Sequence, residues 1–170
     1  VGTNLLHTTL RMDVNIIYSC DIMWHGITVT PHATLLLKGN TIRDAQFAAR
    51  AEGSSGLGID PPTKMIASGN VFSNNHVGIF FPGNSFSTVT HLPMAGNTFT
   101  STANLLPPCD VGLFNYSSTL RGFAGVVTNG TPLTVGTPGN SGIVNNFSFI
   151  RNGVVSNNAV LNVYRAGIQN

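Results

Sequence analysis

The chain alternates apolar and polar residues over short stretches, and one of these stretches recurs along it. Its copies are 35–42 (LLLKGNTI), 65–72 (MIASGNVF) and 92–99 (LPMAGNTF). Each copy reads apolar, any, apolar, any, Gly-Asn, any, apolar, which predicts a period-two strand that enters a turn and leaves as a second strand. Self-similarity at a period of about 20 to 50 residues is typical of solenoids, propellers and arrays.

The Gly-Asn pair predicts one corner in every coil. An earlier copy, at 10–17, lacks the glycine but keeps the asparagine, so the equivalent residues, 25, 30 and 27 positions apart, are Asn15, Asn40, Asn70 and Asn97. Glycine takes positive φ angles without steric cost, and asparagine tolerates them. Coils of this length can stack their strands in parallel at about 4.8 Å. We therefore expect the asparagines to form a ladder of side-chain amide hydrogen bonds.

The last apolar position of the motif predicts the core. In the four copies this position holds Ile17, Ile42, Phe72 and Phe99. Steps of 24 and 26 residues continue the series to Phe123 and Phe149. We expect them to form one inward-facing stack along the axis of a parallel β-solenoid of roughly six coils. Burial of each phenylalanine stabilises such a stack by roughly 1.5–3 kcal/mol.

Composition supports strands and turns. Charged residues make up 8% of the chain, whereas an ordinary soluble domain has about 25%. The surface is therefore built mainly from Asn, Ser and Thr, which suit strands and turns better than helices. This excludes an all-helical fold. No linker or charge block divides the 170 residues, so we interpret 1–170 as a single domain.

The distribution of charged and apolar residues argues against two kinds of binding partner, nucleic acids and membranes. The net charge is +2, and the eight basic residues are scattered without a run that could follow a phosphate backbone, so we expect no nucleic-acid partner. No stretch reaches the 18 or so consecutive apolar residues that a membrane span needs. We expect no membrane span either.

The run 24–48 (WHGITVTPHATLLLKGNTIRDAQFA) resembles the right-handed parallel β-helix repeats of secreted, surface-associated bacterial proteins. This repeat is shared by pectate-lyase-like enzymes and by non-enzymatic surface proteins, and 43–48 is particularly similar to copies in large exported proteins of Bacteroidota. The resemblance implies an all-β fold, a right-handed parallel β-helix, and an extracellular or cell-surface location. It does not transfer an active site. Since the chain begins at Val1 and still reads as coil sequence at its end, we expect it to be a piece of a longer exported protein.

The expected function is that of a structural or adhesive surface module, and the alternative is a polysaccharide-binding or polysaccharide-cleaving domain. Unpaired strands at the ends are expected to bind neighbouring segments of the same protein or other surface proteins. The two readings differ in one feature: a binding module or enzyme should show a groove with clustered carboxylates or aromatic residues on successive coils.

Catalysis finds little support in the acidic residues. No two acidic residues are closer than eight positions in the sequence. The six are Asp13, Asp21, Asp44, Glu52, Asp60 and Asp110. Asp21 and Asp44 lie near one period apart and are the best pair for a hydrolase, which needs two carboxyls about 5 to 10 Å apart. A calcium site with 6 to 8 oxygen ligands is hard to assemble from this set. We therefore expect no lyase or hydrolase activity on acidic or neutral polysaccharides, and we assign no catalytic or cofactor-binding residue.

The remaining candidates have structural explanations. His7 and His32 are one coil apart, but the histidines His7, His25, His32, His76 and His91 show no zinc-binding spacing, so no metal ligand is assigned. Cys20 and Cys109 are interpreted as two buried free thiols. The aromatic residues with a possible sugar-stacking role are Trp24, Phe80 and Phe81, although Trp24 is better explained as a cover over the edge of the core. Asp44, next to Arg43, is expected at a solvated corner or bonded to turn amides.

Overall fold

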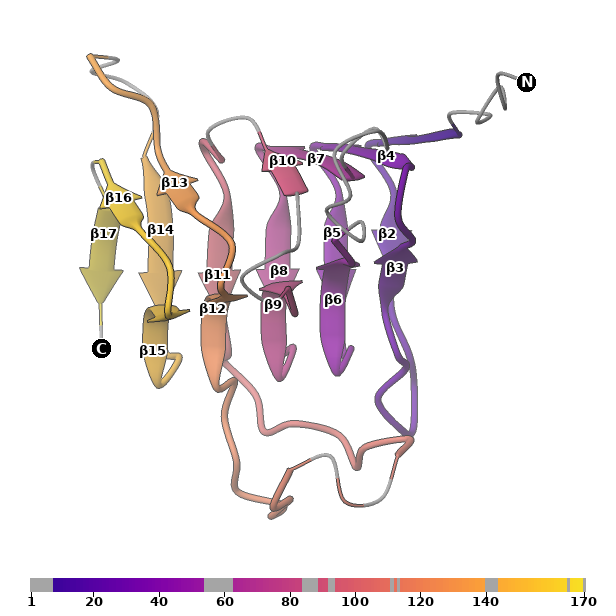
Figure 1. Ribbon diagram of the computed structural model, residues 1–170. Coiled ribbons are helices and arrows are strands. Elements are labelled where there is room, and N and C mark those ends of the chain that lie inside the picture. Colours follow the sequence, from indigo (N-terminus) through magenta and orange to yellow (C-terminus); the bar gives the residue numbers. More distant parts are fainter. Residues whose placement is uncertain are drawn as a thin grey trace.

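The computed structural model describes residues 8–53, 63–83, 89–91, 94–110, 112, 114–139, 144–164 and 166–169. Throughout these residues the regular structure is β-strand, and no helix occurs (Figure 1). This confirms the all-β prediction.

Most of the strands form three parallel sheets, and each sheet takes every third strand along the chain. The first sheet contains β1 (Thr9–Asp13), β4 (Thr34–Lys38), β7 (Thr63–Ser68) and β10 (Val89–His91). The second contains β2 (Ile16–Ile17), β5 (Thr41–Arg43), β8 (Val71–Ser73), β11 (Thr98–Thr100), β14 (Asn145–Ser148) and β17 (Ala166–Gln169). The third contains β3 (Ile27–Val29), β6 (Phe47–Ala51), β9 (Val77–Phe81), β12 (Ala124–Asn129) and β15 (Asn152–Asn157). A further pair consists of β13 (Leu133–Val135) and β16 (Leu161–Val163).

Every strand pairing within the described part of the chain is parallel and in register, so equivalent residues of the repeat lie beside one another. In the second sheet Ile42 is aligned with Phe72, Phe72 with Phe99, and Phe99 with Phe147. The chain thus visits the three sheets in turn and returns to pair with its previous pass, an arrangement compatible with a β-helix-like fold (Figure 1).

The aromatic stack forms the centre of the core. Phe72 and Phe99 stack with ring centroids 4.9 Å apart, and Phe99 and Phe147 follow at 5.0 Å. Ile42 is fully buried in the same cluster, and Ile17 packs against it from the N-terminal end. The prediction is therefore confirmed from Ile17 to Phe99, where the ring spacing matches the distance between neighbouring strands.

The prediction is wrong for Phe123 and Phe149. Phe147 occupies the next stack position, while the side chain of Phe149 is 54% exposed. Phe123 is half-buried in a second apolar cluster with Val77, Ala124 and Val127. The reason is that the chain makes one long circuit of 48 residues between Phe99 and Phe147 instead of the two coils that we expected.

Glycines on the third sheet make room for the phenylalanine rings. A Cβ atom placed on Gly78 would lie 2.5 Å from the Phe99 ring, and one on Gly125 would lie 2.6 Å from the Phe147 ring. Gly78 and Gly125 occupy equivalent positions on β9 and β12, because Val77 pairs with Ala124. Large rings on one sheet thus face residues without side chains on another.

The asparagine ladder is present and is longer than expected. The backbone N–H and the Nδ2 of Asn40 both donate to Asn70 Oδ1, at 2.9 and 3.1 Å, and the same pair of bonds runs from Asn15 to Asn40 and from Asn70 to Asn97. Asn97 donates in turn to Asn145 Oδ1 at 3.0 and 3.3 Å. Asn145 is the rung that the sequence pattern missed, because Val144 stands where the copies at Asn40, Asn70 and Asn97 have glycine.

Each buried rung is also tied to the backbone. Asn70 Nδ2 donates to the carbonyl oxygen of Leu37 at 3.1 Å, and Asn97 Nδ2 donates to that of Ala67 at 2.9 Å. The preceding glycines have positive φ angles, 65° at Gly69 and 69° at Gly96. The Gly-Asn pair therefore marks the corner, as predicted.

Candidate functional site

The long circuit after β11 brings distant parts of the chain together. We call residues 101–122 the crossing segment; 111 and 113 within it lie outside the described residues. It runs along the lower edge of the sheets to the turn between β2 and β3 and returns to β12 (Figure 1). There the backbone N–H of Met23 donates to Pro107 O at 2.7 Å, and Met23 forms a parallel bridge with Pro108. The fully buried Met23 side chain anchors this contact.

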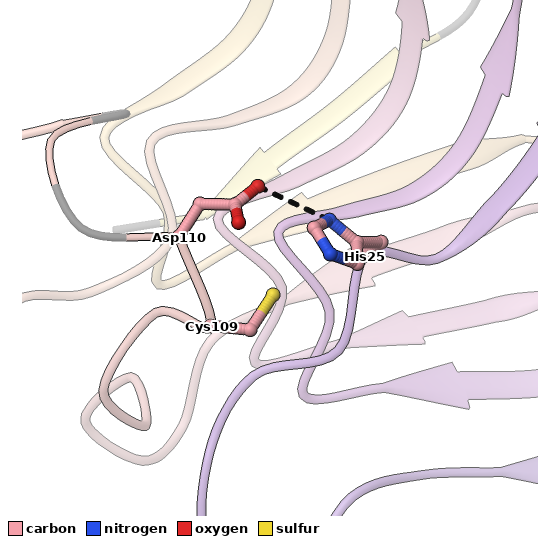
Figure 2. A group of neighbouring side chains, drawn as sticks. All are labelled: His25, Cys109 and Asp110. Carbon is pink, nitrogen blue, oxygen red and sulfur yellow. Dashed lines mark ion pairs between the residues drawn. The ribbon is translucent and has the colours of Figure 1, made fainter.

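Next to this anchor, three side chains of different chemistry converge. Figure 2 shows His25, from the turn before β3, facing Cys109 and Asp110 of the crossing segment. One nitrogen, sulfur or oxygen atom from each residue lies within 4.8 Å of the other two. The His25 Nδ1 atom is 3.3 Å from Asp110 Oδ2. Cys109 is a half-buried free thiol. This group of donors is able to hold a metal ion.

Sequence reasoning treated these three residues separately. His25 and Cys109 are 84 positions apart, about three periods of the repeat, so the repeat pattern places them three repeats apart and not side by side. Only the path of the crossing segment brings them together. The expectation of two buried thiols is wrong, because Cys20 is exposed and Cys109 is half-buried. Both are free, which agrees with the preference for unpaired thiols.

A cavity of about 760 Å³ lies where the crossing segment meets the turn after β14. Its lining comes from the crossing segment and from the next turn, namely Thr102, Thr119, Leu120, Arg121, Phe149, Ile150 and Arg151. A smaller cavity of about 300 Å³ shares both arginines and is also lined by His76, Phe114 and Phe123. The larger cavity thus combines two guanidinium groups with an exposed aromatic ring, and none of the described residues that line it carries a carboxylate.

The backbone at Phe149 is strained. Its φ angle is 57°, and the residues at the equivalent corners, Asp44 and Asn74, have φ angles of 60° and 53°. Asparagine and aspartate tolerate this left-handed conformation, whereas a bulky phenylalanine rarely adopts it. Such strain concentrates at functional positions. The strained corner presents the Phe149 ring to the cavity instead of to the core.

His76 forms a wall of the smaller cavity and does not act as a cation there. Its ring stacks on Phe114 at a centroid distance of 3.7 Å and lies 5.7 Å from the Phe123 ring. Its Nδ1 atom is buried and has no hydrogen-bond partner among the residues that the structure describes. Burial and, to a smaller extent, the nearby positive charge of Arg151 together lower the pKa of His76 from 6.5 to about 4. His76 is therefore neutral at neutral pH.

The two carboxylates considered as a catalytic pair, Asp21 and Asp44, differ in their exposure to solvent. Asp21 is exposed in the turn between β2 and β3. The Asp44 side chain is only 13% exposed and pairs with Arg43 at 3.3 Å, so the expectation of a solvated corner is wrong. Burial raises the pKa of the Asp44 carboxyl, and the Arg43 charge opposes that rise.

The aromatic platform expected as an option from Trp24, Phe80 and Phe81 is absent. Phe81 is fully buried, and Phe80 stacks on Phe47 at 4.9 Å. Trp24 packs against the core, and its Nε1 donates to Arg43 O at 2.9 Å, which confirms its role as a cover over the core. His7 and the side chain of His91 lie outside the described residues, so the His7–His32 pair stays untested.

Comparison of the chain with protein-family models, with curated proteins and with solved structures gives no match in any of the three. Within the described residues, no helix has the length and apolar character needed to cross a membrane.

Proposed function

We propose that the chain is a right-handed parallel β-helix of roughly six coils that serves as a structural or adhesive module of an exported surface protein. The six strands of the second sheet support the coil number. Right-handed crossovers are the rule between parallel strands of one sheet. The extracellular or cell-surface location rests on the resemblance of 24–48 to exported bacterial repeats, including those of Bacteroidota.

The observation that carries this proposal is the apolar surface at the two ends of the stack. At the N-terminal end, the side chains of Val14 and Ile16 are 81% and 72% exposed. At the other end, Ile168 is 70% exposed on β17. The edge strands β2 and β17 each have a neighbour on one side only among the described residues. Open edges with exposed apolar side chains favour the addition of further strands.

The occupant that fits these ends is another β-helix coil, from neighbouring sequence or from another surface protein. A parallel strand satisfies the free backbone groups of β2 or β17 and covers Ile16 or Ile168. The ladder adds chemical specificity at the first end, because Asn15 is exposed and donates toward Asn40. An asparagine in a preceding coil can therefore donate to Asn15 Oδ1 in the same way.

The experiment is sedimentation of the isolated chain over a range of concentrations. We expect association that rises with concentration and that Ile16→Lys or Ile168→Lys weakens at least tenfold, because a charge at the edge opposes strand addition. Val71→Lys is the matched control, since Val71 is 36% exposed but lies on the internal strand β8. A monomeric wild-type chain at all concentrations, or equal effects of all three substitutions, contradicts association through the ends.

A second candidate function is the binding of acidic polysaccharide, and the cavity at the crossing segment favours it. Arg121 and Arg151 provide charge for carboxylate groups, and Phe149 provides an exposed ring for the apolar face of a sugar. Because no carboxylate occurs among the described residues that line the cavity, this arrangement suits binding rather than cleavage.

Polygalacturonate is a suitable probe for this cavity, with retardation in an affinity gel as the readout. Arg151→Gln and Phe149→Ala should each reduce retardation, whereas Lys38→Gln, which removes an exposed charge on β4, should not. Retardation that falls equally in all three variants indicates only general charge attraction and counts against the site.

A further inference from the structure

The His25, Cys109 and Asp110 group has the donor set of a transition-metal site. Zn²⁺ binds Cys sulfur, His nitrogen and carboxylate oxygen at about 2.0–2.3 Å in tetrahedral geometry. Those bond lengths put the ligand atoms about 3.3–3.8 Å apart. His25 Nδ1 and Asp110 Oδ2 are already 3.3 Å apart, and all three donor atoms lie within 4.8 Å of one another. Small rotations of these side chains therefore complete a three-ligand site.

The chemistry of the donors selects the ion. Mg²⁺ and Ca²⁺ prefer oxygen ligands, whereas the thiolate of Cys109 and the imidazole of His25 favour Zn²⁺. Three protein ligands leave the fourth tetrahedral position to water.

The backbone positions the ligands before any ion binds. The Met23 N–H bond to Pro107 O and the Met23–Pro108 bridge hold the two segments together. His25 follows Met23 by two residues, and Cys109 and Asp110 come directly after Pro108. The two segments therefore require little ordering to bring their donors to one ion.

We propose that His25, Cys109 and Asp110 bind one Zn²⁺ ion, which fastens the crossing segment to the turn between β2 and β3. Three bonds form, to one imidazole nitrogen, to the Cys109 sulfur and to a carboxylate oxygen of Asp110, and the thiol proton passes to solvent. The ion joins residues on the first coil to residues that follow β11. It therefore adds a side-chain link to the backbone contact that Met23 makes with Pro107 and Pro108.

The test is Zn²⁺ binding to the full chain, kept reduced with a phosphine, by calorimetry and thermal unfolding. We expect one Zn²⁺ per chain, and a rise in the unfolding temperature of about 5 to 10 °C when free Zn²⁺ is 100 times the dissociation constant. Binding of Co²⁺ should produce a thiolate-to-metal charge-transfer band. Cys109→Ser should abolish this band, and His25→Ala and Asp110→Asn should each weaken Zn²⁺ binding at least tenfold.

Matched variants separate this site from nonspecific binding. Cys20→Ser removes the other free thiol, and Asp21→Asn removes an exposed carboxylate of the same turn; both should bind Zn²⁺ like the wild type. The altered side chains are exposed or half-buried, and circular dichroism verifies that each variant is folded. Absence of stoichiometric binding, a charge-transfer band that persists in Cys109→Ser, or equal losses in Cys20→Ser overturns the proposal.

Discussion

The ring of Phe147 stacks on the ring of Phe99, with centroids 5.0 Å apart and planes 5° from parallel. The chain between them leaves the sheets, contacts the turn that contains Met23 and returns. The stack of rings in the core is therefore continuous from β11 to β14, although the chain between these two strands departs from the regular repeat. An insertion of this length is tolerated because the strands on either side of it, β11 and β14, still pair in register.

The position of Phe99 between two other rings makes it the most sensitive member of the stack. Phe99→Ala removes contacts with both Phe72 and Phe147, and we expect a loss of about 3–5 kcal/mol in the free energy of unfolding. Urea denaturation measures this loss. Phe149→Ala is the control, since Phe149 is exposed, and it should change the free energy by less than about 0.5 kcal/mol. Similar losses in the two variants contradict the stack described here.

The space opposite the rings predicts the effect of a single methyl group. Gly125→Ala places a Cβ atom 2.6 Å from the Phe147 ring and 2.8 Å from Gly153 O. Such overpacking typically costs about 1–3 kcal/mol. Gly153→Ala, whose Cβ would lie 3.4 Å from the same ring, should cost clearly less in the same denaturation experiment. The reverse order of the two effects would show that the rings do not pack against this face.

The ladder predicts a difference between inner and outer asparagines. Asn70→Ala removes the acceptor of two bonds from Asn40 and the Nδ2 donor of one bond to Asn97, all in a fully buried position, while the backbone N–H of residue 70 still donates to Asn97. Each buried polar group left without a partner costs about 1–3 kcal/mol. Asn15→Ala, at the exposed first rung, should cost less. Denaturation midpoints that shift equally for both variants contradict a buried ladder.

The lowered pKa of His76 predicts that the folded chain loses stability in acid. Its pKa is about 4 in the folded chain and about 6.5 when unfolded, so the unfolded chain binds the proton first. The stability provided by neutral His76 is present above pH 6.5 and is lost as the pH falls to about 4, by about 2 to 3 kcal/mol. The raised pKa of Asp44 acts in the opposite direction.

The variant His76→Phe isolates this contribution, because it keeps a ring between Phe114 and Phe123 and leaves Asp44 in place. Urea midpoints at pH 7 and pH 4.5 should differ less in His76→Phe than in the wild type. An unchanged pH dependence would show that His76 is protonated as readily in the folded chain as in the unfolded one.

The sequence was sufficient to predict the all-β structure and its corners as long as successive repeats had a similar length. The asparagines from Asn15 to Asn97 and the apolar residues from Ile17 to Phe99 recur at a regular period. This period can be recognised in the sequence because the ladder and the stack each need the same type of side chain at the equivalent position of every repeat. After Phe99 the period fails, since the insertion has its own packing and conceals which phenylalanine returns to the core. Phe147 lies on the strand before the corner, and Phe149 lies at the corner itself. The two residues are two positions apart, so both fit the same period-two alternation, and the sequence pattern does not distinguish them.

The candidate sites depend entirely on this insertion. His25 meets Cys109, and Phe149 lies beside Arg121, only because the crossing segment follows one particular path over the turns. Nothing in the spacing of these residues encodes that path. A strained φ angle at Phe149 and an unpartnered Nδ1 at His76 are likewise properties of the three-dimensional structure.

The parallel direction of all strands has a consequence for assembly. The edge at β2 and the edge at β17 are different surfaces, and in the hydrogen bonds of the ladder each asparagine donates to the asparagine of the following repeat. Two copies joined through these edges therefore meet head to tail and leave one free edge of each kind. Such a contact has no two-fold axis, and unless its rotation closes a ring it continues into an open filament.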